Sequence, residues 1–258
     1  MKTSGRIKQA FAKAKAQGRG AFVAYLTAGF PDAAASEKAF VALADGGVDI
    51  LEVGVPFSDP FADGSVIRSA AYKALEGGMD AEGAIALAAR VRRARADVAI
   101  VLFSYYNPLF SMGLDAFAAK AAAAGVDAVL AVDVPLEERA ELVDALAAHG
   151  LSFVPLVAPN TPAERVRAIA QGLGDDTFVY AMTVKGVTGA RAELPPELPA
   201  RLDEVRSLAA PLPVAAGFGI STKAQAQAIS RHADGFVVGS ALVKRLAAEG
   251  KIEGELLP

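Results

Sequence analysis

The stretch LEVGVPFSDPFADG, residues 51–64, joins a short apolar strand to a loop rich in acid, proline and glycine. Residues 51–55 are apolar or glycine except for Glu52, which is typical of a parallel strand with both faces buried. The following loop carries Asp59 and Asp63, and its two prolines restrict the backbone. Ligands of α/β folds bind where parallel strands end, so this loop is the first candidate for a functional site.

The same kind of apolar run recurs along the whole chain, alternating with Ala-rich amphipathic segments. This alternation indicates βαβ units and a parallel sheet. Eight such strands predict a single domain, residues 1–258, with the α/β fold of a (β/α)₈ TIM barrel. A doubly wound open sheet is the alternative, weakened because no G-x-G-x-x-G follows the first strand. The expected strands are residues 21–29, 49–56, 98–106, 127–135, 152–159, 177–184, 213–219 and 235–240.

Composition narrows the possible functions. With 258 residues, 53% of them hydrophobic, the chain can bury one large core. The net charge of −3 and the scattered cations argue against nucleic acid as a partner, and the basic run at residues 90–95 is predicted to be the solvated end of a helix. No apolar run is long enough to span a membrane and the first ten residues do not resemble a signal peptide, so a cytoplasmic protein is expected.

Local patterns predict several helices and their ends. Two helices, over residues 65–76 and 80–95, should follow the acidic loop. Thr161 with Glu164, and Thr222 with Gln225, have the spacing of capping boxes.

The residue inventory restricts the chemistry to carboxylates. There is no cysteine, which excludes disulfides, thiolate metal sites and a cysteine nucleophile. The two histidines, His149 and His232, are expected at helix C-termini, where a cation is favourable. A histidine metal site or a Ser-His triad is therefore not expected, and acid/base chemistry must rest on Asp and Glu.

Glu52 and Asp63 are the candidate proton carriers. Glu52 points to the opposite face from Leu51 and Val53, into the barrel, where burial would raise its pKa toward neutrality. Asp63 lies on the stiff loop that could aim a second carboxylate over the same mouth. The structural alternatives are an ion pair for Glu52 and simple turn chemistry for Asp63.

Three glycine clusters end the last strands, at residues 186–190, 216–221 and 237–243. Glycines allow backbone N–H groups to approach an anion, and a helix beginning at Ser240 would add its positive dipole end. Together they predict a phosphorylated substrate. Lys185 follows the sixth strand and could form a Schiff base with a carbonyl substrate, although an ordinary surface amine is the simpler interpretation.

From Phe11 to Val243 the chain resembles the alpha subunit family of tryptophan synthase, through the motifs AYLTAGFPD, LEVGVPFSDPFADG, GVDAVLAVDVP, KGVTGA, GFGIS and VGSALV. The resemblance implies a barrel with an extra N-terminal helix that cleaves indole-3-glycerol phosphate to indole and glyceraldehyde 3-phosphate. It also implies an α₂β₂ complex in which pyridoxal phosphate belongs to the beta subunit, with no cofactor or metal in this chain. The sequence has a shortened C-terminus relative to the family, which predicts an exposed apolar seam between the first and last helices.

The resemblance also assigns roles to particular positions. Glu52 and Asp63 match the catalytic acids of the family. Substrate-binding positions, for the indole ring, the phosphate and the lid, are matched by Tyr25, Phe103, Tyr105, Tyr180, Thr188, Gly189, Phe218, Gly219, Gly239 and Ser240. Positions that face the beta subunit are matched by Pro56, Asp59, Pro60, Asn107 and Pro135. Two alternatives stay open: a Schiff-base phosphosugar aldolase using Lys185, and a weakly catalytic regulatory subunit that activates the beta chain.

Overall fold

The computed structural model describes residues 3–183, 196–217 and 219–256. Its strands form one parallel sheet in the order β5-β4-β3-β2-β1-β9-β8-β7-β6. The strands are β1 (Ala21–Thr27), β2 (Ile50–Gly54), β3 (Ala99–Ser104), β4 (Ala128–Ala131), β5 (Ser152–Phe153), β6 (Leu156–Val157), β7 (Val179–Met182), β8 (Val214–Gly217) and β9 (Gly235–Val238). Each lies within one of the eight runs that the sequence predicts.

The sheet closes on itself through β5 and β6, which stand at the two ends of the strand order but are separated only by Val154 and Pro155. The Val154 N–H donates to the Val129 carbonyl in β4 (2.9 Å), and the Tyr180 N–H in β7 donates to the Pro155 carbonyl (2.9 Å). Proline has no N–H to give to the ladder, which explains the break in the fifth strand. The predicted (β/α)₈ barrel is therefore confirmed, and the open sheet is excluded.

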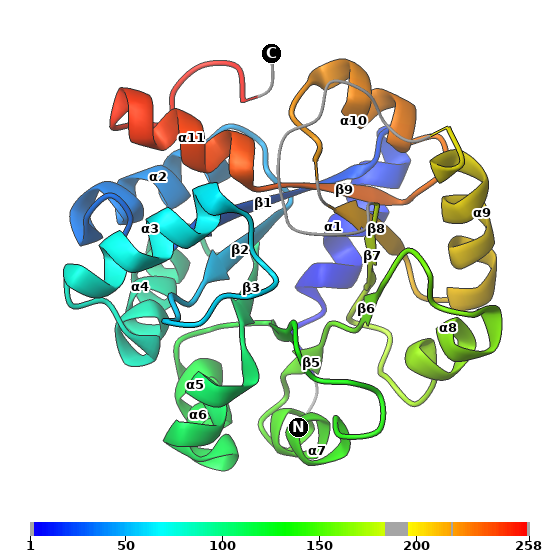
Figure 1. The fold of residues 1–258 in the computed structure, drawn as a ribbon, viewed down its shortest axis with the longest axis horizontal. Coiled ribbons are helices and arrows are strands. Elements are labelled where there is room, and N and C mark those ends of the chain that lie inside the picture. Colours follow the sequence, from blue (N-terminus) through cyan, green and yellow to red (C-terminus); the bar gives the residue numbers. More distant parts are fainter. Residues whose placement is uncertain (1–2, 184–195, 218, 257–258) are drawn as a thin grey trace.

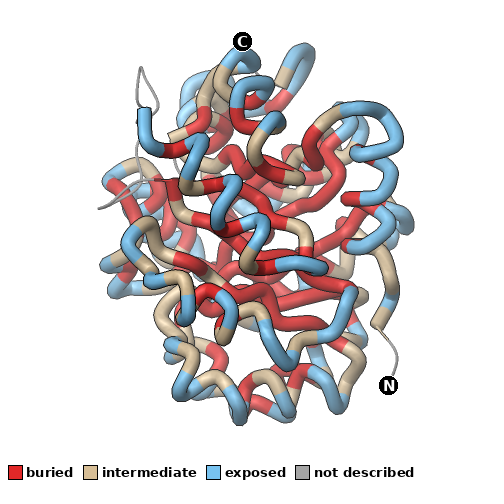
Figure 2. Tube along the Cα trace, turned by 90° about the vertical axis from the view of Figure 1, so that its right-hand side faces the viewer, coloured by how far each residue is buried: buried red, intermediate tan, exposed pale blue. Residues whose placement is uncertain are grey.

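Helices surround the barrel, and the strands occupy its interior (Figure 1). The strands are almost completely buried, whereas each outer helix buries one face and exposes the other (Figure 2). The helices are α1 (Arg6–Ala16), α2 (Ala33–Asp45), α3 (Ser65–Glu76), α4 (Ala81–Ala94), α5 (Tyr106–Met112), α6 (Leu114–Ala123), α7 (Ala140–Ala148), α8 (Ala163–Ala170), α9 (Leu198–Ala209), α10 (Lys223–Ile229) and α11 (Ser240–Glu249). The two helices predicted after the acidic loop are α3 and α4.

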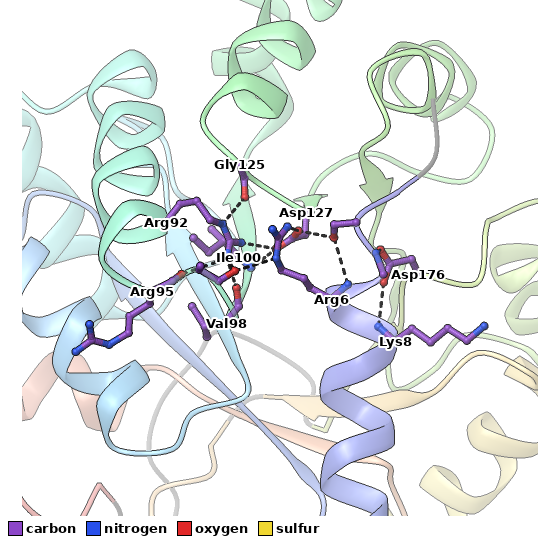
Figure 3. Close-up of polar contacts among 12 residues, drawn as sticks. Arg6, Lys8, Arg92, Arg95, Val98, Ile100, Gly125, Asp127 and Asp176 are labelled. Carbon is purple, nitrogen blue, oxygen red and sulfur yellow. Dashed lines mark hydrogen bonds and ion pairs between the residues drawn. The ribbon is translucent and has the colours of Figure 1, made fainter.

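The extra N-terminal helix α1 is tied to the end of the barrel where the strands begin. Asp176, just before β7, accepts the Gly5 N–H (2.7 Å) and the Lys8 N–H (2.9 Å), so it caps a helix whose own sequence offers no side-chain cap. The guanidinium of Arg6 in α1 donates to the carboxylate of Asp127, which lies just before β4 (2.9 Å) (Figure 3). A carboxylate at a helix N-terminus satisfies free N–H groups and complements the helix dipole.

The prediction for the basic run at residues 90–95 is confirmed in part, since Arg93 in the last turn of α4 is exposed. The run does end a helix, α4, but Arg92 is largely buried and is not solvated. Its guanidinium donates to Asp127 (2.7 Å) and to the carbonyls of Gly125 (3.0 Å) and Val98 (2.6 Å) (Figure 3). Sequence reasoning missed this because Gly125 and Asp127 are 33 and 35 positions away from Arg92 in the chain.

The predicted helix ends are confirmed in part. Thr222 and Gln225 form the reciprocal capping box at α10. The prediction of a capping box at Thr161 is wrong, because α8 begins after Pro162 without a side-chain cap. The Thr161 hydroxyl accepts the Ala158 N–H instead (3.0 Å). His149 caps the C-terminal end of α7, and its ring contacts Asp115 (2.8 Å). His232 follows α10 and contacts Asp203 (2.9 Å).

The expected apolar seam between the first and last helices is not seen, because no large apolar side chain in the described parts of α1 and α11 is exposed. Helix α11 packs against β1 and α3, and after it Ile252 is buried. A groove of about 520 Å³ lies between the loop after α1 and α10, and polar residues and glycines line most of it beside the stacked rings of Phe22 and Phe236 (5.0 Å between centroids). None of the helices in the described ranges combines the length and the apolar character that a bilayer crossing demands.

Candidate active site

A cavity opens at the end of the barrel where the strands finish, and it brings together most of the predicted site. Its walls include Glu52 and Asp63 together with predicted substrate-binding residues, namely Tyr25, Phe103, Tyr180, Gly219, Gly239 and Ser240. The cavity is small, with a volume of about 40 Å³. Side chains at the mouth must therefore move to admit a bicyclic ring.

Glu52 lies in the middle of β2 with its side chain inside the barrel. It is 1% exposed, and its Oε1 atom has no hydrogen-bond partner among the described residues. Burial disfavours the charged carboxylate and raises the pKa of Glu52 from 4.5 to about 8. The group is consequently a protonated acid at neutral pH. The alternative interpretation, a structural ion pair, is excluded among the described residues, since no cation contacts this side chain.

Asp63 is held over the same cavity by a rigid loop. The Asp63 N–H donates to the Pro60 carbonyl (3.0 Å), and the Tyr105 hydroxyl donates to the Asp63 carboxylate (3.0 Å). Burial raises the pKa of Asp63 to about 6, while the Tyr105 hydrogen bond and the nearby Arg68 oppose this. Asp63 is therefore mostly ionised at pH 7. The two carboxyl groups thus carry different charges at the same pH, as an acid and an acceptor require.

Tyr105 fastens the acidic loop. Besides donating to Asp63, its hydroxyl accepts the Ala62 N–H (3.0 Å), and its ring packs against Phe57 and Phe61 (centroids 5.3 Å from each). The resemblance places Tyr105 in the indole pocket, but it is not among the residues that line the cavity. In this structure it holds the Asp63 side chain in place through the hydrogen bond to its carboxylate.

Aromatic rings form the side walls of the cavity. Tyr25 meets Phe103 edge to face (5.3 Å between centroids, 77°). Tyr180 comes from β7, and its hydroxyl lies 2.1 Å from where a Cβ on Gly217 would be. Tyr25 has the same relation to Gly54, at 2.4 Å. A side chain at either glycine would displace a wall tyrosine, which is a physical reason for glycine at both strand ends.

The glycine-lined side of the cavity suits an anion. Gly219 has a φ of +89°, a conformation that side chains disfavour. Gly239 is the N-cap residue of α11 and Ser240 is its first residue, so the positive end of that helix faces the cavity. Thr188, Gly189 and Phe218, and Lys185 of the aldolase alternative, lie outside the described residues.

Four further residues line the cavity that the sequence did not single out: Ile67, Ile220, Val237 and Ala241. Ile67 is in the first turn of α3, and Ile220 follows Gly219. Ile220, Val237 and Ala241 lie within the recognised glycine clusters and Ile67 lies three residues after the acidic loop, which was the only available signal. Among the described residues no cluster of His, Asp and Glu has the arrangement of a metal site.

The residues expected to face a partner divide into two groups. Asp59, Asn107 and Pro135 are exposed, whereas Pro56 and Pro60 are buried within the loop. Two large apolar side chains are exposed on neighbouring segments, Phe61 (68%) beside Asp59 and Phe110 (59%) on the helix of Asn107. A partner that covered these two rings would remove their apolar surface from water.

A neutral buried acid, an ionised carboxylate and a helix N-terminus around one barrel mouth define an acid–base enzyme of the (β/α)₈ class that takes an anionic substrate. Comparison with known proteins identifies the family. The family profile described as Tryptophan synthase alpha chain matches residues 11–256, and the chain belongs to this family.

Relatives and solved structures agree. The chain is 47% identical to the tryptophan synthase alpha chain of Citrifermentans bemidjiense over 93% of this chain and 88% of that protein. It is 42% identical to the alpha chain of a Picosynechococcus species, covering 96% and 93%. Its fold matches a structure of Mycobacterium tuberculosis tryptophan synthase with a TM-score of 0.87 at 36% identity, covering 96% and 93%.

Proposed function

We propose that this chain cleaves indole-3-glycerol phosphate by a retro-aldol step to indole and glyceraldehyde 3-phosphate, as the alpha subunit of a tryptophan synthase in tryptophan biosynthesis. The observation that carries the proposal is the difference in protonation state between two acids of one cavity: Glu52 is neutral in its buried site and Asp63 is ionised. The family of the chain and its glycine-lined anion site support the same substrate.

The proposed reaction begins with a proton transfer from Glu52 to C3 of the indole ring. The ring then carries a positive charge that Asp63 stabilises by accepting a hydrogen bond from the ring N–H. The Glu52 carboxylate next takes the proton of the adjacent side-chain hydroxyl as the C–C bond breaks. The electron pair of the broken C–C bond returns to the ring and neutralises its positive charge. Indole and glyceraldehyde 3-phosphate are then released, and Glu52 is protonated again.

The remaining walls bind and orient the substrate. Tyr25, Phe103 and Tyr180 would enclose the indole ring, and the backbone of Gly219, Gly239 and Ser240 would receive the phosphate. The protonated ring serves as the electron sink of the reaction, so the proposal assigns no cofactor or metal to this chain.

The proposed partner is a beta subunit that holds pyridoxal phosphate and receives indole in an α₂β₂ complex. Exposed Phe61, Phe110, Asp59, Asn107 and Pro135 around the barrel mouth suit such a contact. Buried Pro56 and Pro60 would act by shaping the loop. No nucleic acid or membrane partner is proposed, and the proposed location is the cytoplasm.

An indole-release assay tests the function. The isolated chain is expected to form indole from indole-3-glycerol phosphate, and to do so faster after a beta subunit is added. Absence of indole from both mixtures would overturn the proposal. Activity confined to the mixture would favour the regulatory subunit, and a borohydride-trapped substrate adduct would favour the aldolase that uses Lys185.

The pH dependence of kcat/KM should be bell-shaped. Activity is expected to rise as Asp63 ionises near pH 6 and to fall as Glu52 loses its proton near pH 8. The second ionisation of a phosphate monoester also lies near pH 6, so Asp63→Asn separates the two groups. In that variant the residual rate should lose the acid limb if it belongs to Asp63. An acid limb that persists would assign it to the substrate.

A further inference from the structure

Glu52 must carry a negative charge for part of the reaction in a site built to keep it neutral. This follows from the proposed function, on which the inference rests. The carboxylate formed when Glu52 releases its proton is buried, and its Oε1 has no partner in the described chain. An uncompensated carboxylate in an apolar site is costly, and a hydroxyl donor within reach would reduce that cost.

The described residues that line the cavity offer three hydroxyl groups, on Tyr25, Tyr180 and Ser240. Ser240 lies at the helix terminus on the anion side. Tyr180 comes from β7, which pairs with β6 and β8, and its hydroxyl points toward Gly217. Tyr25 alone of the three lies on a strand that pairs with the strand of Glu52.

Tyr25 and Glu52 are direct partners in the register of β1 and β2. In-register residues of neighbouring parallel strands face the same side of the sheet, about 5 Å apart. The Tyr25 hydroxyl extends over Gly54, two residues beyond Glu52 on the same strand. The ring is fixed between Phe103 and the backbone at Gly239, so the hydroxyl is confined to this end of β2.

The present partner of this hydroxyl is weakly bound. The Tyr25 hydroxyl and the Thr27 hydroxyl are 3.3 Å apart, long for an O–H···O hydrogen bond. A carboxylate is a better acceptor than a neutral hydroxyl. Burial, and then the negative charge of Asp63, raise the pKa of Tyr25 well above its ordinary value, so the phenol keeps its proton and remains a donor.

We propose that Tyr25 is a positioning residue that donates a hydrogen bond from its hydroxyl to the Glu52 carboxylate while Glu52 is ionised. The hydroxyl exchanges the Thr27 hydroxyl for the carboxylate and returns when Glu52 recovers its proton from the substrate. No proton leaves Tyr25. The role belongs to the hydroxyl and is separate from the contact of the aromatic ring with the indole.

Tyr25→Phe tests the proposal, because it removes the hydroxyl and retains the ring. The expected kcat is lower by about 10-fold or more, with KM changed by less than about threefold, since the lost hydrogen bond forms after substrate has bound. The alkaline limb of kcat/KM should move up by about one pH unit, because the ionised form of Glu52 has lost a donor. Loosened packing alone would lower the maximal rate, but it would not also raise the pKa of the alkaline limb of kcat/KM.

Thr27→Val is the matched control. It deletes the same Tyr25–Thr27 hydrogen bond from the other side at nearly constant volume and leaves the Tyr25 hydroxyl in place. Its kcat should stay within about twofold of the wild-type value. Equal losses in the two variants, or an unchanged alkaline limb in Tyr25→Phe, would overturn the inference. If the wild-type chain releases no indole, the lyase assignment fails instead.

Discussion

Replacing Glu52 by Gln is expected to lower kcat for indole formation by about 10³-fold or more, because the amide cannot deliver a proton to the ring or accept one from the hydroxyl. The side chain keeps its size and its place in β2, so substrate binding should persist. Steady-state indole release measures the rate, and binding of a substrate analogue measures the retained affinity.

The same substitution should stabilise the protein. The pKa of Glu52 is about 8 in the folded chain against 4.5 for the exposed group, so the folded state binds more protons between these values. Stability contributed by this group is therefore lost as the pH rises from about 4.5 to about 8. Glu52→Gln removes this dependence and is expected to raise the free energy of unfolding by roughly 1–3 kcal/mol at pH 7. Near-normal turnover, or a variant less stable than the wild type at pH 7, would contradict this account of Glu52.

Removing the Asp127 carboxylate should destabilise the fold more than any other single polar change described above. Its side chain is fully buried and accepts from Ser4 (2.6 Å), Arg6 (2.9 Å), Arg92 (2.7 Å) and the Ile100 N–H (2.8 Å). Asp127→Ala leaves Arg92 buried without its counter-charge and an N–H group without an acceptor. The expected loss is about 3–5 kcal/mol of unfolding free energy, measured by urea denaturation.

Asp175→Ala is the control at the same end of the barrel. Asp175 also pairs with a cation of α1, Lys8, but both side chains are exposed. Removal of this exposed pair should lower the unfolding free energy far less than removal of Asp127 does, because water screens the charges. Equal losses for the two variants would mean that the Asp127 network contributes no more than a surface ion pair. Because Asp127 lies far from the cavity mouth, at the other end of its strand, kcat measured below the unfolding temperature should be unchanged.

The fold was largely predictable because its signals are local. Eight β-branched runs alternate with Ala-rich helical segments, and this alternation predicts a parallel sheet. The strands of the structure fall inside those runs. The acidic loop was equally readable, since a lone Glu within an apolar strand and a carboxylate between prolines and glycine have few structural uses. The Thr161 capping box failed because the hydroxyl found a nearer backbone donor at Ala158.

Other features depend on residues that meet only in the folded chain. Nothing local shows that Arg92 reaches Asp127, that Asp176 caps α1, or that Tyr105 holds Asp63. The partners are separated by 35, 171 and 42 positions, and hydrogen bonds over such distances depend on strand register and barrel closure.

By itself the sequence determined which strands form, where the acids stand along them, and the family to which the chain belongs. The tertiary structure decided that Glu52 is buried and neutral, whereas Asp63 is hydrogen-bonded and ionised. The physical reason is that a carboxyl group of given identity titrates according to its solvation and its donors. Those are set by which walls close around it, which is a property of the assembled barrel.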